Sequence, residues 1–134
     1  MGYAARMRFE APDLALLDAA EEVEIETAAQ DGAAHRTIIW IVVDGDDAFV
    51  RSVNGSGARW YREAVARPDA VAIHVDGRSL SARVEAAADA TSVERVSEAL
   101  GRKYATSRAS LRSMLEPHTL ETTLRVIPAT APQA

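Results

Sequence analysis

The feature that most constrains the fold is the stretch TIIWIVVD, Thr37–Asp44, because nearly all of its side chains are apolar. Most of them are also β-branched, and β-branched residues favour the extended backbone of a strand. A strand that is apolar on both faces is typically covered on both sides. We therefore predict one central strand over residues 37–44.

Five further segments carry strand patterns. In EEVEIETA, Val23, Ile25 and Thr27 alternate with glutamates, which predicts a half-exposed strand. The dipeptide Asp76-Gly77 is a strong signal for a tight hairpin turn, and the GDD stretch predicts a second hairpin. The predicted strands cover residues 21–28, 37–44, 48–53, 70–75, 78–87 and 120–127.

Amphipathic segments lie between these strands. Predicted helices cover residues 11–20, 58–66, 91–104 and 107–115. Hairpins with interposed helices indicate an α+β fold, and six antiparallel strands most easily avoid exposed edges by closing into a small barrel. We predict a single domain over residues 1–134, with an N-terminal helical segment over about residues 1–20 and a frayed tail over residues 129–134.

Composition narrows the function classes. The 134 residues contain no cysteine, which excludes disulfides and thiol catalysis and suits a reducing compartment. The net charge of −5 argues against nonspecific nucleic-acid binding. The longest strongly apolar run, Ile38–Val43, is far shorter than the ~20 residues of a membrane helix. We expect a cytoplasmic protein with neither nucleic acid nor membrane as a partner.

No local motif for metal binding or nucleophilic catalysis is present. The three histidines are scattered and form no HExxH-type pattern, so we predict no metal site. A GxSxG elbow is also missing. Tyr61, His74 and Tyr104 are weak candidates for a proton donor, and the position of His74 within an apolar strand favours a structural role for it.

The stretch VRSVNGSGARWYREAV, residues 50–65, suggests an anion site instead. Arg51 and Ser52 precede a glycine-bearing turn, whose free N–H groups and following helix start favour negative charge. Arginine can bind a phosphate through two parallel hydrogen bonds. With Arg36 and Thr37 at the start of the central strand, these residues could hold a phosphorylated ligand beside an aromatic ring. Alternatively, Trp60 and its neighbour Tyr61 only pack the helix onto the sheet.

The segment RTIIWIVVDGDDAFVRSVNGSGARWYREAVARPDAVAIHVDG, residues 36–77, resembles the split β-barrel proteins that bind flavin or deazaflavin (FMN or F420). In the small deazaflavin-dependent reductases, an Arg-Thr pair precedes a strand, a hairpin ends in a serine, and a Trp-Tyr helix follows. The sequence is most similar to the small DUF2255-type proteins, with RKY at residues 102–104 and TTLRVIP at residues 122–128. The similarity covers about Val23 to Pro128.

This resemblance implies a six-stranded antiparallel split β-barrel with short peripheral helices. It also implies a homodimer whose cofactor, F420 or FMN, lies at the subunit interface. Residues that match the cofactor-binding positions are Arg36, Thr37, Trp40, Arg51, Ser52, Arg59 and Trp60.

The function that follows from the resemblance is a flavin- or deazaflavin-dependent reductase acting on a small organic substrate, with the redox step carried by the cofactor. Two alternatives stay open. The chain could bind a cofactor or small ligand without turnover, or serve as a ligand-free dimeric accessory protein.

Overall fold

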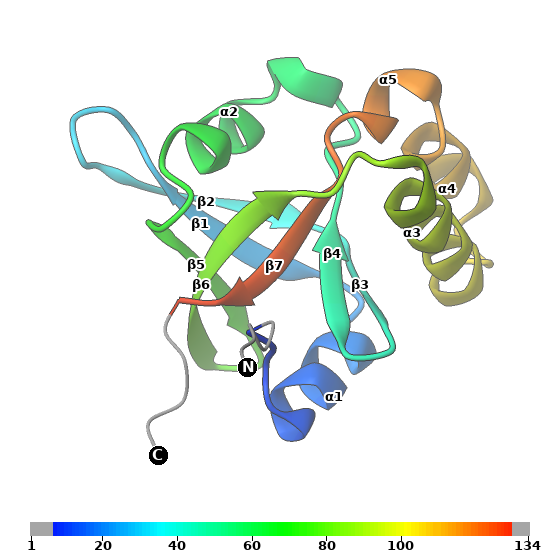
Figure 1. The fold of residues 1–134 in the computed structure, drawn as a ribbon, viewed down its shortest axis with the longest axis horizontal. Coiled ribbons are helices and arrows are strands. Elements are labelled where there is room, and N and C mark those ends of the chain that lie inside the picture. Colours follow the sequence, from blue (N-terminus) through cyan, green and yellow to red (C-terminus); the bar gives the residue numbers. More distant parts are fainter. Residues whose placement is uncertain (1–6, 130–134) are drawn as a thin grey trace, which may run out of the picture.

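A curled antiparallel sheet of seven strands forms the centre of the fold, with short helices around it (Figure 1). The computed structural model describes residues 7–129. Its elements are α1 (Ala11–Ala19), β1 (Val23–Ala28), β2 (Ala34–Ile39), β3 (Ile41–Asp44), β4 (Asp47–Val50), the 3-10 turn η1 (Gly55–Gly57), α2 (Arg59–Ala66), β5 (Val71–Val75), β6 (Arg78–Ala86), α3 (Ala90–Lys103), α4 (Arg108–Met114), α5 (Pro117–Leu120) and β7 (Leu124–Pro128). Within residues 7–129, no helix has the length and apolar character needed to cross a bilayer.

The predicted α+β class is confirmed, and the predicted count of six strands is wrong. The helix expected near the N-terminus is α1, while residues 1–6 of that segment and residues 130–134 of the predicted tail lie outside the described part of the chain. The short helix α5 had no counterpart in the prediction, because a four-residue element leaves no readable period.

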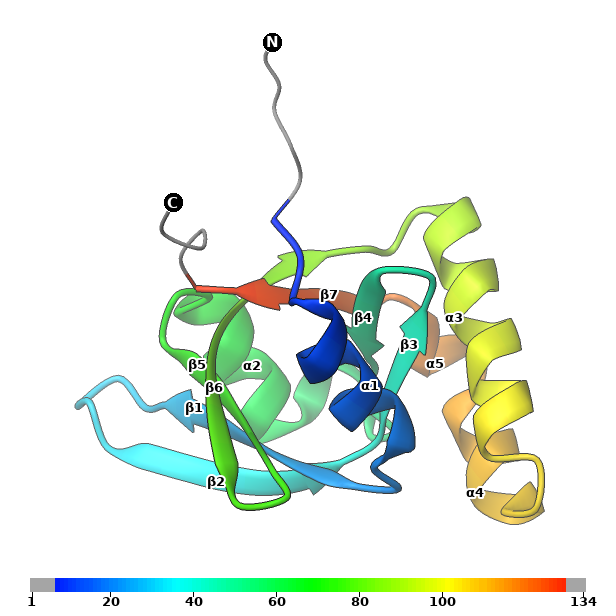
Figure 2. The same ribbon diagram turned by 90° about the horizontal axis from the view of Figure 1, so that it is seen from below.

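The seventh strand arises because the apolar run 37–44 breaks at Trp40 into β2 and β3. The strand order is β2-β1-β5-β6-β7-β4-β3, so the two halves of the run form opposite edges of the sheet. Since the chain passes through a single residue from one edge to the other, the sheet has to curl back on itself into a half-barrel (Figure 2). The prediction of one central strand covered on both sides is therefore wrong, and Ile38 in β2 is 61% exposed.

The hairpin predictions are confirmed. β5 and β6 pair with Val75 opposite Arg78, and the two turn residues Asp76 and Gly77 have φ angles of 50° and 76°. Positive φ at both central positions is the type I′ geometry that matches the twist of paired strands. The GDD turn joins β3 to β4, with a positive φ of 63° at Gly45.

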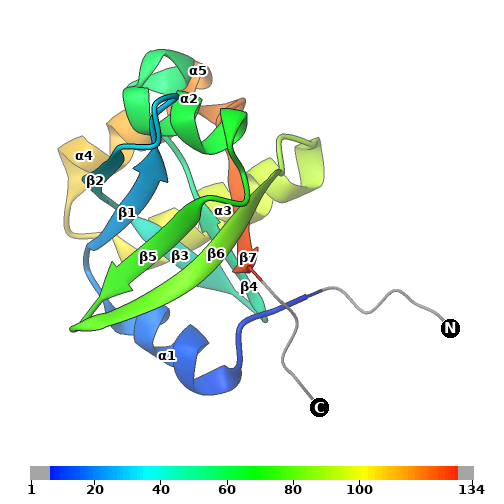
Figure 3. The same cartoon turned by 90° about the vertical axis from the view of Figure 1, so that its left-hand side faces the viewer.

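Two apolar clusters hold the helices against the sheet. Inside the curl, buried residues such as Ile25 and Ile73 pack with Leu17 of α1 and Trp60 of α2. These two helices lie at opposite ends of the curled sheet (Figure 3). On the outer side of β3 and β4, Phe49 packs with apolar residues of α3 and α4.

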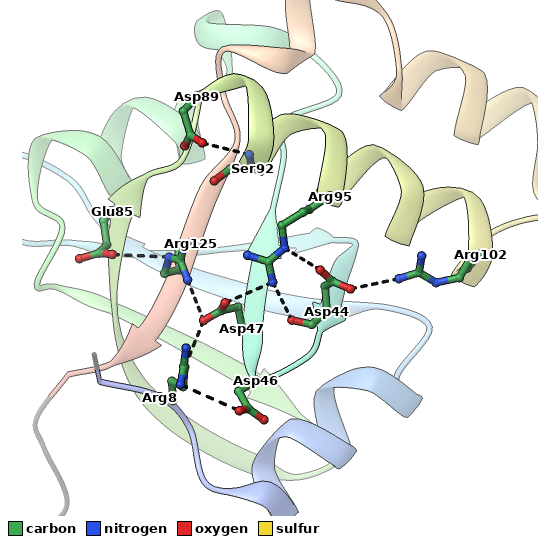
Figure 4. Close-up of polar contacts among 10 residues, drawn as sticks. All are labelled: Arg8, Asp44, Asp46, Asp47, Glu85, Asp89, Ser92, Arg95, Arg102 and Arg125. Atoms are coloured by element: carbon green, nitrogen blue, oxygen red, sulfur yellow. Dashed lines mark hydrogen bonds and ion pairs between the residues drawn. The ribbon is translucent and has the colours of Figure 1, made fainter. Parts of the chain in front are cut away.

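A cluster of ion pairs fastens α3 to the strands beneath it (Figure 4). Arg125 Nη1 on β7 lies 2.7 Å from Asp47 Oδ1 on β4, although the atoms are not aligned for a hydrogen bond. Arg95 of α3 pairs with Asp44 at 2.7 Å and with Asp47 at 3.3 Å. Burial alone would raise the pKa of the Asp47 carboxyl, but the arginine contacts outweigh it and hold that pKa below its ordinary value. Both guanidinium groups also lie within 5.3 Å of the centre of the Phe49 ring.

Candidate functional site

An open cleft of about 330 Å³ lies where β2 passes into β3. Its lining residues are Glu22, Thr37, Ile38, Ile39, Trp40, Arg51, Val53, Asn54, Trp60, Ser110, Ser113 and Met114. They come from the residue before β1, the β2–β3 junction, the loop after β4, the start of α2 and one side of α4. The chain has two tryptophans, and both line this cleft.

The loop after β4 is held in shape by buried hydroxyl groups. The Ser52 hydroxyl donates to the Gly55 carbonyl over 2.8 Å, and the Ser52 N–H donates to the Thr122 hydroxyl oxygen over 2.9 Å. Gly55 has a φ of +74°, and a Cβ at this position would lie 3.0 Å from Cδ2 of His118. Glycine is therefore required at the turn that brings this loop to the cleft.

Arg51 is the buried charge of the cleft, with a side chain that is 2% exposed. Its Nε donates to Thr123 Oγ1 over 3.0 Å, its Nη1 to Ser97 Oγ over 3.0 Å, and its Nη2 to the Val93 carbonyl over 3.1 Å. A longer contact of 3.4 Å joins Nη1 to the Met114 carbonyl. Burial lowers the pKa of Arg51 to about 10, and no carboxylate among residues 7–129 forms an ion pair with it. The guanidinium is thus hydrogen-bonded by neutral groups but has no counterion within residues 7–129.

Trp40 is fixed by Tyr104 at the end of α3. The two rings stack with centroids 3.7 Å apart and planes 2° apart. The Tyr104 hydroxyl donates to the Glu21 carbonyl over 2.7 Å, with a longer contact to the Ile41 carbonyl, and burial raises the pKa of Tyr104 to about 12. Because Tyr104 covers one face of the Trp40 indole, a ligand in the cleft has only the other face and the edges to contact.

The structure gathers four of the seven predicted cofactor-binding residues at the cleft: Thr37, Trp40, Arg51 and Trp60. The other three lie elsewhere. Arg36 is exposed on β2 and pairs with Glu24 and Glu26 over 3.7 and 3.5 Å. Ser52 is buried beside the cleft and shapes the loop, and Arg59 is exposed at the start of α2.

The three candidate proton donors do not line the cleft. His74 Nε2 lies 2.8 Å from Glu26 Oε1 on the strands β5 and β1. Tyr61 is half-buried, and burial together with Glu121 raises its pKa. Tyr104 lies behind Trp40, with its hydroxyl turned to backbone carbonyls. In residues 7–129, no group of three potential metal ligands converges.

Sequence reasoning missed the cleft residues that come from distant segments. Glu22 precedes β1, while Ser110 and Ser113 belong to α4. Glu22 and Arg51 are the charged residues among those that line the cleft in the described part of the chain. No local motif links position 22 to positions 110 and 113, so only the folded chain brings them together.

Solved structures with low sequence identity share this fold. The conserved hypothetical protein Rv2991 from Mycobacterium tuberculosis matches with a TM-score of 0.66 and 13% identity, over 99% of this chain and 87% of that one. HutZ, the heme storage protein from Vibrio cholerae, matches with a TM-score of 0.64 and 15% identity, over 96% of this chain and 93% of that one. An F420-H2 dependent reductase, FDR-A, matches with a TM-score of 0.59 and 12% identity, over 80% of this chain and 93% of that one. These similarities show that the chain has the split-barrel fold that these proteins share.

Sequence comparison places the chain more narrowly than the fold does. Among curated proteins, none matches its sequence. One family model covers residues 13–126, from α1 to β7, and this span includes every residue that lines the cleft. The chain therefore belongs to DUF2255, the family described as "Uncharacterized protein conserved in bacteria".

Proposed function

We propose that this chain is a flavin- or deazaflavin-dependent reductase that acts on a small organic substrate in the cleft. The observation that carries the proposal is the cleft itself, in which both tryptophans and a buried guanidinium meet. Ligand sites are typically concave, mostly apolar, and equipped with a few polar groups that fix orientation. The fold is shared with an F420-H2 dependent reductase, which supports the same class of chemistry.

The residues present fit a flat ring. Ile38 and Val53 line the cleft and are 61% and 40% exposed, so they offer apolar surface that a ring would cover. Together with Thr37 and Trp40, they are the residues that would hold F420 or FMN. When bound, such a cofactor supplies the hydride, and the chain contributes position and electrostatics.

The phosphate of the cofactor is assigned to exposed arginines. Arg36 and Arg59 are both exposed and lie outside the cleft. We propose that they meet the phosphate from this chain or from a second copy in a homodimer. The exposed Ile38 and Val53 support a homodimer, since a second copy would bury them together with the cofactor. The lack of cysteine supports the cytoplasm as the compartment.

A second candidate function is ligand binding without turnover. It is favoured by the position of Tyr61, His74 and Tyr104, none of which lines the cleft. Among the described residues, the only carboxylate that lines it belongs to the exposed Glu22. The fold is also that of a heme storage protein, so it does not by itself require catalysis.

Binding and turnover separate these candidates. Intrinsic fluorescence reports the cleft directly, because both tryptophans line it. We expect saturable quenching by F420 or FMN, native mass spectra of a dimer with bound cofactor, and oxidation of the reduced cofactor by an organic acceptor. Binding without oxidation of the cofactor by a panel of acceptors would favour the second candidate. No quenching and no bound mass with either cofactor would refute the proposed function.

A further inference from the structure

We infer that Arg51 is the receptor for a single negative charge on the substrate, and that the cleft takes a small planar monocarboxylate that enters with its charged end first. This inference rests on the proposed function in treating the cleft as the substrate site. It goes further in giving Arg51 to the substrate and leaving the cofactor phosphate to other residues.

Arg51 carries a buried charge for which residues 7–129 supply no counterion. Arg51 is 2% exposed, and its acceptors are two hydroxyl groups and two carbonyls. Taking an ion out of water costs several kcal/mol unless an opposite charge compensates it. Among residues 7–129, no carboxylate forms an ion pair with this guanidinium, whereas the buried Arg125 pairs with Asp47 and Glu85. Since Arg51 lines the cleft, an anion in the cleft would compensate its charge.

Most of the hydrogen-bond donors of Arg51 are already occupied by the protein. A guanidinium has five N–H groups, and four contacts of Arg51 already have protein acceptors. One N–H group is left, so an anion at Arg51 can accept a single hydrogen bond from it rather than the two parallel ones that arginine often gives to carboxylate or phosphate. No second cation lines the cleft in the described chain, and Glu22, which also lines it, adds a negative charge. One unit of negative charge therefore matches the site better than the roughly two units of a phosphate monoester.

The cleft is small and has aromatic and apolar walls. Trp40 and Trp60 line it together with the apolar side chains of Ile39 and Met114. Its volume of about 330 Å³ is at the small end of the ~300–1,000 Å³ that ligand sites usually have. Aromatic walls of this kind pack against a flat ring of one or two cycles, with the acidic group at Arg51.

Three probes at constant ionic strength test the charge assignment through tryptophan fluorescence. Benzoate is a planar monoanion, benzamide is its neutral isostere, and inorganic phosphate carries charge without a ring. We expect benzoate to bind at least about tenfold more tightly than benzamide, because hydrogen bonds to a charged group are the stronger ones. Phosphate should neither quench nor compete. Equal affinity for benzoate and benzamide, no binding of benzoate, or phosphate binding tighter than benzoate would each overturn the inference.

Variants locate the effect at Arg51. Arg51→Met should remove the preference for benzoate, and Arg51→Lys, which keeps the charge, should retain part of it. Thr123 and Thr27 are both buried threonines, but Thr123 accepts a hydrogen bond from Arg51, whereas Thr27 donates to Glu63 and does not line the cleft. Thr123→Val, which removes a group that holds the guanidinium in place, should weaken benzoate more than threefold, while the matched Thr27→Val should stay within about twofold of wild type. Arg51→Met could fail to fold, so the other two variants also decide the matter. If Arg51→Lys and Thr123→Val both prefer benzoate over benzamide as strongly as wild type does, the assignment of Arg51 is contradicted.

The same titrations separate this inference from the proposed function. F420 or FMN affinity should stay within about threefold of wild type in Arg51→Lys, since the cofactor phosphate is assigned elsewhere. A large loss of cofactor affinity in that variant would overturn the inference and leave the proposed function standing. If the chain binds benzoate but neither cofactor, the proposed function is refuted, while the assignment of Arg51 as the receptor for the anion still holds.

Discussion

The substitution Asp47→Asn should destabilise the fold strongly, because it removes the shared partner of three arginines, Arg8, Arg95 and Arg125. The Asp47 side chain is 7% exposed and that of Arg125 is 9% exposed, so their ion pair of 2.7 Å is buried. Removing one partner of a buried pair typically costs 3–5 kcal/mol, because the other charge stays buried without compensation. In the variant, Arg125 still has Glu85 as an ion-pair partner at 3.6 Å, and Arg95 still has Asp44 at 2.7 Å. We therefore expect the low end of that range, about 3 kcal/mol.

Urea unfolding at pH 7, followed by circular dichroism, measures this loss, and Asp46→Asn is the matched control. The neighbouring Asp46 is 71% exposed and contacts Arg8 only at 3.9 Å, so its substitution should cost less than about 1 kcal/mol. A loss below about 1 kcal/mol for Asp47→Asn would show that the cluster does not fasten α3.

The same cluster predicts an acid dependence. The pKa of Asp47 is held below its ordinary value of 3.8, so its contribution to stability is present above that pH and disappears as pH falls through the folded-state pKa. The stability difference between wild type and Asp47→Asn should therefore shrink below about pH 4. A difference that stays constant down to pH 2 would mean that the carboxylate charge is not what stabilises the fold.

Three further substitutions test separate parts of the account. Trp60→Ala should lower the unfolding free energy by about 3–5 kcal/mol, because Trp60 is only 6% exposed and packs in the core. A loss below about 1 kcal/mol would show that Trp60 does not hold α2 to the sheet. Gly55→Ala should lower the unfolding free energy by about 2 kcal/mol, because Gly55 has a positive φ and lies close to His118. Gly57→Ala, with open space around the residue, should change it by no more than about 0.5 kcal/mol, and equal losses in the two variants would contradict the turn geometry. Ile38→Glu should leave monomer stability unchanged and weaken the proposed dimer, as sedimentation velocity can measure; undiminished association would exclude this surface from the interface.

The parts of the fold that could be predicted are those that depend on near neighbours in sequence. The type I′ turn at Asp76-Gly77 requires φ angles that these two residues tolerate, and the alternation in VEIETA gives the side of β1 that is buried. Such preferences act within a few residues, so a single sequence displays them.

The parts that could not be predicted depend on distant contacts. The break at Trp40 follows from β2 pairing with β1 while β3 pairs with β4, and an apolar run carries no sign of such a change of partner. The burial of Arg51 likewise depends on hydroxyl groups at positions 97 and 123. For the site, resemblance found four residues of the cleft, but Glu22 and the serines of α4 come together only through the fold.

The central claim is that the cleft beside Trp40 is where a flavin-type ring and a small anionic substrate meet. A crystal structure of the chain grown with F420 or FMN and benzoate tests it most directly. The account predicts difference density for the ring against Ile38 and Val53, and for the benzoate carboxylate within hydrogen-bond distance of Arg51. Ring density bound away from this cleft, or a carboxylate seated on exposed arginines while Arg51 keeps only its protein contacts, would contradict it.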